Sequence, residues 1–155
     1  MRTHIHGRRS WRWVGALLLG LVAPTTLAAE PTWKVPRDAR IENLEALIQP
    51  GSENNEDVKA MCGGFTLTAE EVLIYLRGAR TFSTEQEHEK GSWFPCVVRG
   101  SLVSGKKKQR KAVTFTISAI LTARIEEPGK PTVELICEGA CEERMTKIIL
   151  KHQEE

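Results

Sequence analysis

KAVTFTISAILTARI, residues 111–125, is the stretch that decides the fold class. Apolar residues occupy every second position from Val113 to Ile125, and threonine, serine or arginine fills most positions between them. Ile120 is the one apolar residue on the polar side. Alternation with a period of two is typical of an antiparallel strand that is buried on one face. We therefore expect a long, half-buried strand here.

Shorter alternating stretches lie on both sides of this one. CVVRGSLV (96–103) follows a proline and predicts a preceding strand, and residues 133–137 predict a following one. Residues 81–88 are a candidate edge strand. Pro128-Gly129 suits a turn between the last two strands, because glycine accepts the positive φ that such a turn needs.

The register of the last two strands follows from their apolar faces. A slip by one residue would turn a whole face away from the core. Keeping the faces together predicts three pairs: Ile125 with Val133, Ala123 with Leu135, and Leu121 with Cys137.

Two segments before these strands have helical features. Thr68-Ala69-Glu70-Glu71 is a capping box followed by an apolar stripe, so we expect a helix over 69–79. Ile41, Leu44, Leu47 and Ile48 recur at helical spacing, which predicts an earlier helix capped by Asp38 and ended by Pro50-Gly51. A short helical turn over 58–61 is also expected, whereas the type of the apolar element over 145–150 stays open.

Together these elements predict an α+β fold of one or two N-terminal helices packed on a three- to four-stranded antiparallel meander sheet, stabilised by disulfides. The expected organisation is an export signal over 1–29, an N-terminal lead and helix over 30–61, and an α+β domain over 62–155.

The first 29 residues have the features of a secretory signal peptide. Four arginines and no acid precede VGALLLGLVA (14–23), and small residues end the segment at Ala28-Ala29. The apolar run is about half the length that a membrane-spanning helix needs. We expect cleavage after Ala28 or Ala29 and a periplasmic or secreted protein, with a bacterial envelope as the default. Arg8-Arg9 leaves the twin-arginine route open.

Charge argues against a nucleic-acid partner once the signal is removed. Taking its four arginines from the 22 basic residues leaves 18, against 20 acidic residues. A nucleic-acid-binding domain is usually strongly basic. We also expect no stable membrane insertion after cleavage.

All four cysteines follow the signal: Cys62, Cys96, Cys137 and Cys141. An even count in an exported chain predicts structural disulfides. Cys96 and Cys137 would lie two strand spacings apart, about 9–10 Å, whereas disulfide Cα atoms lie within about 7 Å. This favours Cys62–Cys96 with Cys137–Cys141, and leaves Cys62–Cys137 with Cys96–Cys141 as the alternative. Zinc held by Cys62, Cys137, Cys141 and His88 is a less favoured hypothesis, because no second close pair supports it.

The strongest charge cluster is GKKKQRK (105–111). Such a hairpin tip can be merely solvated, discouraging edge pairing, or it can bind an anionic lipid surface, an acidic polymer or an acidic protein. Trp93, in a predicted loop, is a possible interface anchor. The predicted anion- or partner-binding residues are Lys106, Lys107, Lys108, Arg110, Lys111 and Trp93.

No catalytic or cofactor motif stands out in the sequence, and we expect no cofactor or metal. The leading hypothesis is an exported, non-enzymatic binding or accessory protein of the cell envelope, of the inhibitor or immunity type, with a protein or an anionic envelope component as partner. The alternative is a small metal-dependent or hydrolytic enzyme that uses His88 and the acids around it.

Overall fold

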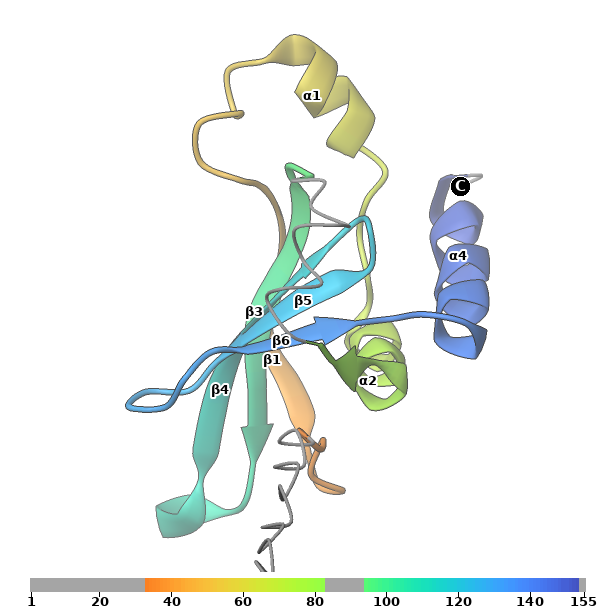
Figure 1. Ribbon diagram of the computed structural model, residues 1–155. Coiled ribbons are helices and arrows are strands. Elements are labelled where there is room, and N and C mark those ends of the chain that lie inside the picture. Colours follow the sequence, from red (N-terminus) through yellow and green to blue (C-terminus); the bar gives the residue numbers. More distant parts are fainter. Residues whose placement is uncertain (1–32, 83–93, 154–155) are drawn as a thin grey trace, which may run out of the picture.

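A computed structural model describes residues 33–82 and 94–153 of the chain. Its centre is a six-stranded antiparallel sheet with the strand order β1-β3-β4-β5-β6-β2. Three helices and two disulfides complete the described part. The α+β class with disulfides is therefore confirmed, but the expected three or four strands are six, and the chain enters the sheet by a strand instead of a helix (Figure 1).

The predicted N-terminal helix is wrong: the segment is strand β1 (Arg40–Ile48), paired with β3 (Cys96–Ser104). The register shifts between Glu42 and Glu45, and Asn43 has a φ of 53°. This irregularity is a β-bulge, which adds one residue to a strand. Because of it, Ile41 and Leu44 both pack against the core although they are three positions apart, an interval that would put them on opposite faces of a regular strand.

The predicted strand over 111–125 is two strands, β4 (Lys111–Ser118) and β5 (Thr122–Glu126), joined by a tight hairpin. Leu121 closes the turn with a φ of 63°, and its amide donates to the Ser118 carbonyl at 3.0 Å. Ile120, the exception to the alternation, lies at this turn and is 37% exposed. Ile117 faces Ala123 across the hairpin, so apolar residues stay on the core side in both strands.

The predicted register between the last two strands is confirmed. Ala123 pairs with Leu135 and Ile125 with Val133 where β5 meets β6 (Val133–Ile136), and the Cys137 amide donates to the Leu121 carbonyl at 3.0 Å. The turn between them carries Gly129 at a φ of 78°. The candidate edge strand is β2 (Arg80–Thr81), which pairs with β6; residues 83–93 lie outside the described residues.

Helix α2 (Ala69–Gly78) begins at the predicted capping box. The Thr68 hydroxyl accepts from the Glu71 amide, and the Glu71 carboxylate accepts from the Thr68 amide at 2.8 Å. Helix α1 (Glu56–Cys62) covers the expected short turn. The C-terminal element is helix α4 (Ala140–Gln153), in which Met145 is fully buried.

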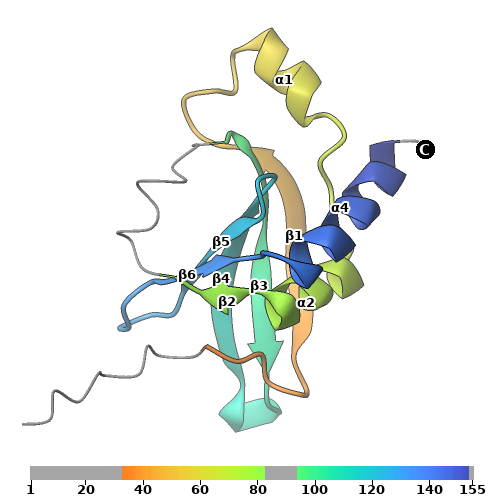
Figure 2. The same cartoon turned by 45° about the vertical axis from the view of Figure 1, so that its right-hand side comes forward.

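The core lies between one face of the sheet and the helices α2 and α4, which stand together on that side (Figures 1 and 2). Tyr75 of α2 is fully buried among sheet residues such as Phe115 and Ile117. Its hydroxyl donates to the Leu121 carbonyl at 2.9 Å. Burial raises the pKa of this phenol, so it remains a hydrogen-bond donor at any physiological pH.

Two disulfides link α1 and α4 to the sheet, and their pairing is the one favoured from the sequence. Cys62 at the end of α1 is bonded to Cys96 at the start of β3, and Cys137 after β6 is bonded to Cys141 in the first turn of α4. No described cysteine is free. Cys96 and Cys137 belong to opposite sides of β4 and β5, so three strand spacings separate their strands instead of the expected two. Such disulfides indicate an oxidising compartment.

Candidate anion-binding surface

The basic hairpin tip joins β3 to β4 and contains a single 3-10 turn, η1 (Lys107–Gln109). Gly105 enters this turn with a φ of 78°, and a Cβ at its position would lie 2.3 Å from the Gln109 carbonyl oxygen. Only glycine fits this conformation and this close approach. The sequence therefore fixes a compact tip at the end of the hairpin.

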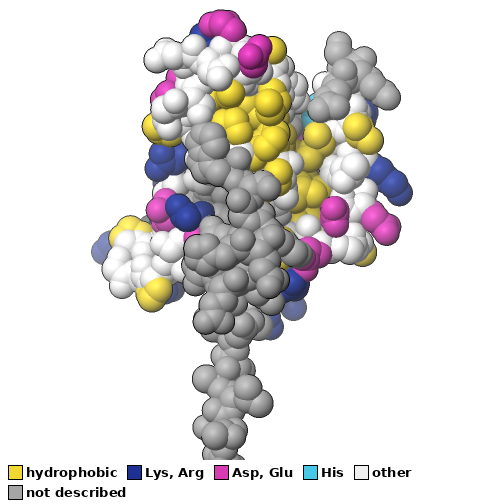
Figure 3. Space-filling view, turned by 45° about the horizontal axis from the view of Figure 1, so that its top comes forward, with side chains coloured by type: hydrophobic (Ala, Val, Ile, Leu, Met, Phe, Trp, Pro, Cys, Tyr) yellow, Lys and Arg dark blue, Asp and Glu magenta, His cyan; other side chains and the backbone are white. Residues whose placement is uncertain are grey.

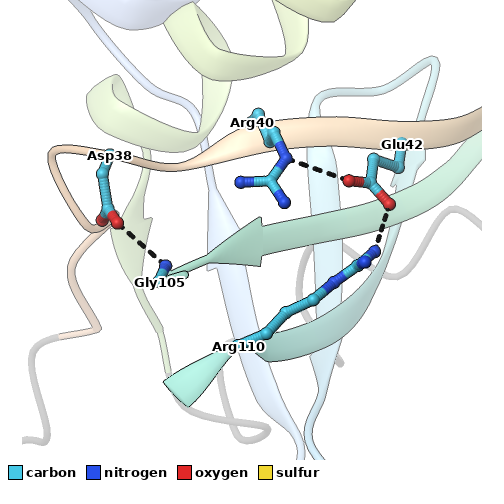
Figure 4. Close-up of polar contacts among 5 residues, drawn as sticks. All are labelled: Asp38, Arg40, Glu42, Gly105 and Arg110. Atoms are coloured by element: carbon cyan, nitrogen blue, oxygen red, sulfur yellow. Dashed lines mark hydrogen bonds and ion pairs between the residues drawn. The ribbon is translucent and has the colours of Figure 1, made fainter. Parts of the chain in front are cut away.

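The start of β1 holds the tip in place from the side. Asp38, expected to cap a helix, instead accepts a hydrogen bond from the Gly105 amide at 2.8 Å (Figure 4). Glu42 accepts from Arg40 Nε at 3.0 Å and from Arg110 Nη2 at 2.5 Å. Ion pairs this exposed stabilise a fold by about 1 kcal/mol or less. Their main effect is to orient the tip, because they join the start of β1 to Gly105 and to Arg110 on either side of η1.

The predicted binding residues therefore divide into groups. Arg110 is engaged by Glu42, whereas Lys106, Lys108 and Lys111 are exposed and form none of the ion pairs found among the described residues. Lys107 lies in η1, and its side chain is outside the described part. Trp93 and His88 both lie outside the described residues.

A second basic site, which the sequence did not reveal, lies where the chain before β1 passes the end of α2. An open groove of about 370 Å³ is lined there by Trp33, Lys34, Val35, Arg37, Leu76, Arg77 and Ala79. Four of these residues are apolar, and Trp33, Val35 and Ala79 pack against the core from its edge. The three cations are exposed, and among the described residues none of them forms an ion pair. We call this site the Trp33 groove.

The Trp33 groove and the hairpin tip lie at the same end of the domain, which we call the basic end. Arg37 of the groove is followed directly by Asp38, which contacts the tip (Figure 4). Helix α1 is at the opposite end, and the loop and first turn there carry the exposed acids Glu53, Glu56 and Asp57. Figure 3 shows acidic side chains at that far end, and others along the side of the molecule. A molecule with this charge separation presents its basic end to an anion.

The histidine of the described residues, His152, lies against the capping box of α2. His152, which belongs to α4, lies with its Nε2 2.9 Å from Glu71 Oε2 of the capping box. Burial would raise the pKa of Glu71, but hydrogen bonds from Thr68 and His152 outweigh it, so the pKa is lowered. In residues 33–82 and 94–153, no group of three His, Cys, Asp or Glu side chains is placed to hold a metal ion.

Comparison with known proteins adds no functional assignment: the chain matches no protein-family model, no curated protein and no solved structure. None of the described helices has both the length and the apolar character to span a membrane. Function must therefore be argued from the surface itself.

Proposed function

We propose that the protein is an exported, non-enzymatic binding or accessory protein of the cell envelope, which binds an anionic partner through its basic end. The observation that carries the proposal is the fixed position of the hairpin tip. Asp38 and Glu42 hold the tip against β1, while Lys106, Lys108 and Lys111 are exposed beside it. A site ordered before binding loses less conformational entropy when its partner arrives.

The placement of the reactive residue types supports a binding role over an enzymatic one. The four cysteines are consumed in disulfides, His152 is bound to Glu71, and the buried Tyr75 serves Leu121. The alternative, a small hydrolytic or metal-dependent enzyme, depends on His88, which lies outside the described residues. An inhibitor or immunity-type role fits the same surface, because an acidic protein is one class of anionic partner.

The proposed export predicts that the N-terminal signal is cleaved. The order of basic, apolar and small residues in 1–29, together with two disulfides, leads us to expect a processed chain. N-terminal sequencing of protein purified from its host should begin at Ala29 or Glu30. Stable cytosolic protein with Met1 intact and reduced cysteines would contradict export.

Binding by the tip is tested by replacing Lys106, Lys107 and Lys108 together with glutamine. Affinity for polyphosphate, a soluble polyanion, should fall at low salt and the difference should shrink as salt screens the charges. The free energy of unfolding should change by no more than about 0.5 kcal/mol, because the substituted positions lie on an exposed tip. Affinity is measured by fluorescence anisotropy with labelled polyphosphate.

The matched control for this variant is K59Q/K130Q/K147Q, which removes the same charge elsewhere. Lys59 and Lys130 are paired with Glu56 and Glu127, and Lys147 is exposed on α4. Equal losses in the two triple variants would show that net charge, and not the tip, governs binding.

A further inference from the structure

The Trp33 groove combines two surface chemistries in one place. Its floor is apolar, formed by Trp33, Val35, Leu76 and Ala79, and its exposed cations are Lys34, Arg37 and Arg77. None of the described residues that line the groove is acidic. A ligand that satisfies both parts carries negative charge next to apolar atoms. A fully hydrated inorganic anion would leave the indole and aliphatic floor unused.

The groove and the tip together cover more of the basic end than one small molecule would. The contact between Asp38 and Gly105 joins the segment that carries Lys34 and Arg37 to the hairpin tip (Figure 4), and Arg77 of α2 lines the same groove as those two cations. An extended anionic surface can engage all of them at once. Near an anionic bilayer each lysine or arginine contributes about 1 kcal/mol.

The position of the groove along the chain points to the same partner. Trp33 follows the apolar segment Val14–Ala23 of the export signal by nine intervening residues, 24–32. Nine extended residues span about 30 Å at most. While the signal is still in the membrane, the groove is therefore held within about that distance of the outer lipid surface.

We infer that the basic end docks on an anionic phospholipid surface, with one lipid head group in the Trp33 groove. The inference rests on the proposed function and names its partner. The phosphate lies among Arg37, Arg77 and Lys34, and the glycerol and first acyl carbons cover Trp33. An amphipathic indole favours this boundary between polar and apolar layers. The lysines of the tip supply additional attraction that is not specific for the head group.

The test uses the oxidised, processed protein and vesicles of phosphatidylcholine with and without phosphatidylglycerol. We expect binding only to the vesicles that contain phosphatidylglycerol. R37Q/R77Q should bind them about 25-fold more weakly, which corresponds to about fivefold for each cation lost. The matched control K59Q/K130Q loses two cations that belong to neither the Trp33 groove nor the hairpin tip, and its binding should stay within about twofold of the parent's.

The fluorescence of Trp33 gives a second measurement, which electrostatic attraction alone would not change. Trp93→Phe leaves Trp33 as the only tryptophan of the processed chain. Its emission should shift to shorter wavelength on phosphatidylglycerol vesicles and be quenched by lipids brominated near the head group. Polyphosphate should cause neither change, and glycerol phosphate, a soluble head group, should compete only weakly because it lacks the acyl carbons.

The outcomes separate the two proposals. If the parent protein binds neither polyphosphate nor vesicles, the proposed function is overturned, and this inference with it. If polyphosphate still binds, two results overturn the inference alone: R37Q/R77Q and K59Q/K130Q bind vesicles equally, or Trp33 emission is unchanged on vesicles. Thermal unfolding of each variant confirms that its fold is intact.

Discussion

Replacing Cys62 and Cys96 together with alanine should lower the free energy of unfolding by about 4 kcal/mol, because their disulfide closes a loop with a sequence separation of 34. In the chain-entropy model the cost grows with the logarithm of loop length. Cys137 and Cys141 have a sequence separation of only 4, so the corresponding double variant should lose about 2 kcal/mol.

Urea unfolding of the two double variants and the parent protein measures this difference. The two substitutions are matched, since each removes one disulfide and leaves two alanines. A larger loss from Cys137 and Cys141 than from Cys62 and Cys96 would show that loop entropy does not dominate. Packing of Cys141 against Gly78 would then be the term to examine, because a Cβ on Gly78 would lie 3.0 Å from Cys141 Sγ.

Tyr75→Ala should destabilise the domain by about 4 kcal/mol, the usual loss when a large buried aromatic side chain is truncated. Tyr75→Phe should cost only about 1 kcal/mol, because it removes one hydrogen bond and keeps the packing. The Leu121 carbonyl would stay satisfied in both variants by the Cys137 amide, at 3.0 Å.

The comparison of these two variants separates packing from hydrogen bonding at the centre of the core. Chemical denaturation followed by circular dichroism gives both values. If Tyr75→Ala does not fold, Tyr75→Phe still measures the contribution of the hydrogen bond to Leu121. Similar losses from the two variants would contradict the dominance of packing at this position.

The error at β1 has a physical origin in its bulge. Sequence reasoning took the three-residue interval from Ile41 to Leu44 as one turn of helix, since a regular strand brings residues to one face at intervals of two. The additional residue at Asn43 changes that interval to three. Neither propensity nor periodicity separates these two geometries over nine residues, and pairing with β3 decides between them.

The hairpin between β4 and β5 could not be predicted from the sequence, again because its periodicity is misleading. Its turn keeps odd-numbered residues facing odd-numbered residues, as in the pair Ile117 and Ala123. The alternation therefore continues unbroken through Leu121, and one long strand gives the same pattern as two short ones. The predicted register with β6 is nevertheless correct, because it depends on which face of the strand is apolar and not on how long the strand is.

Local signals were read correctly where a few neighbouring residues determine the geometry. The capping box at Thr68 and Glu71 needs only its own four residues, and the disulfide pairing needed only approximate distances. The hairpin tip was recognised from its run of lysines. The Trp33 groove was missed because Trp33 and Arg77 come together only after the lead packs beside α2, although a tryptophan followed by Lys34 and Arg37 was a signal in the lead.

The disulfide pattern also bears on how the protein acquires its covalent structure. Cysteines are joined in the order in which they occur, the first with the second and the third with the fourth. A chain delivered N-terminus first presents Cys62 and Cys96 before Cys137 arrives, and Cys141 follows four residues later. An oxidase that joins thiols as they emerge therefore makes the native bonds directly. For a chain exported in this way, we therefore expect oxidative folding to depend little on thiol–disulfide exchange.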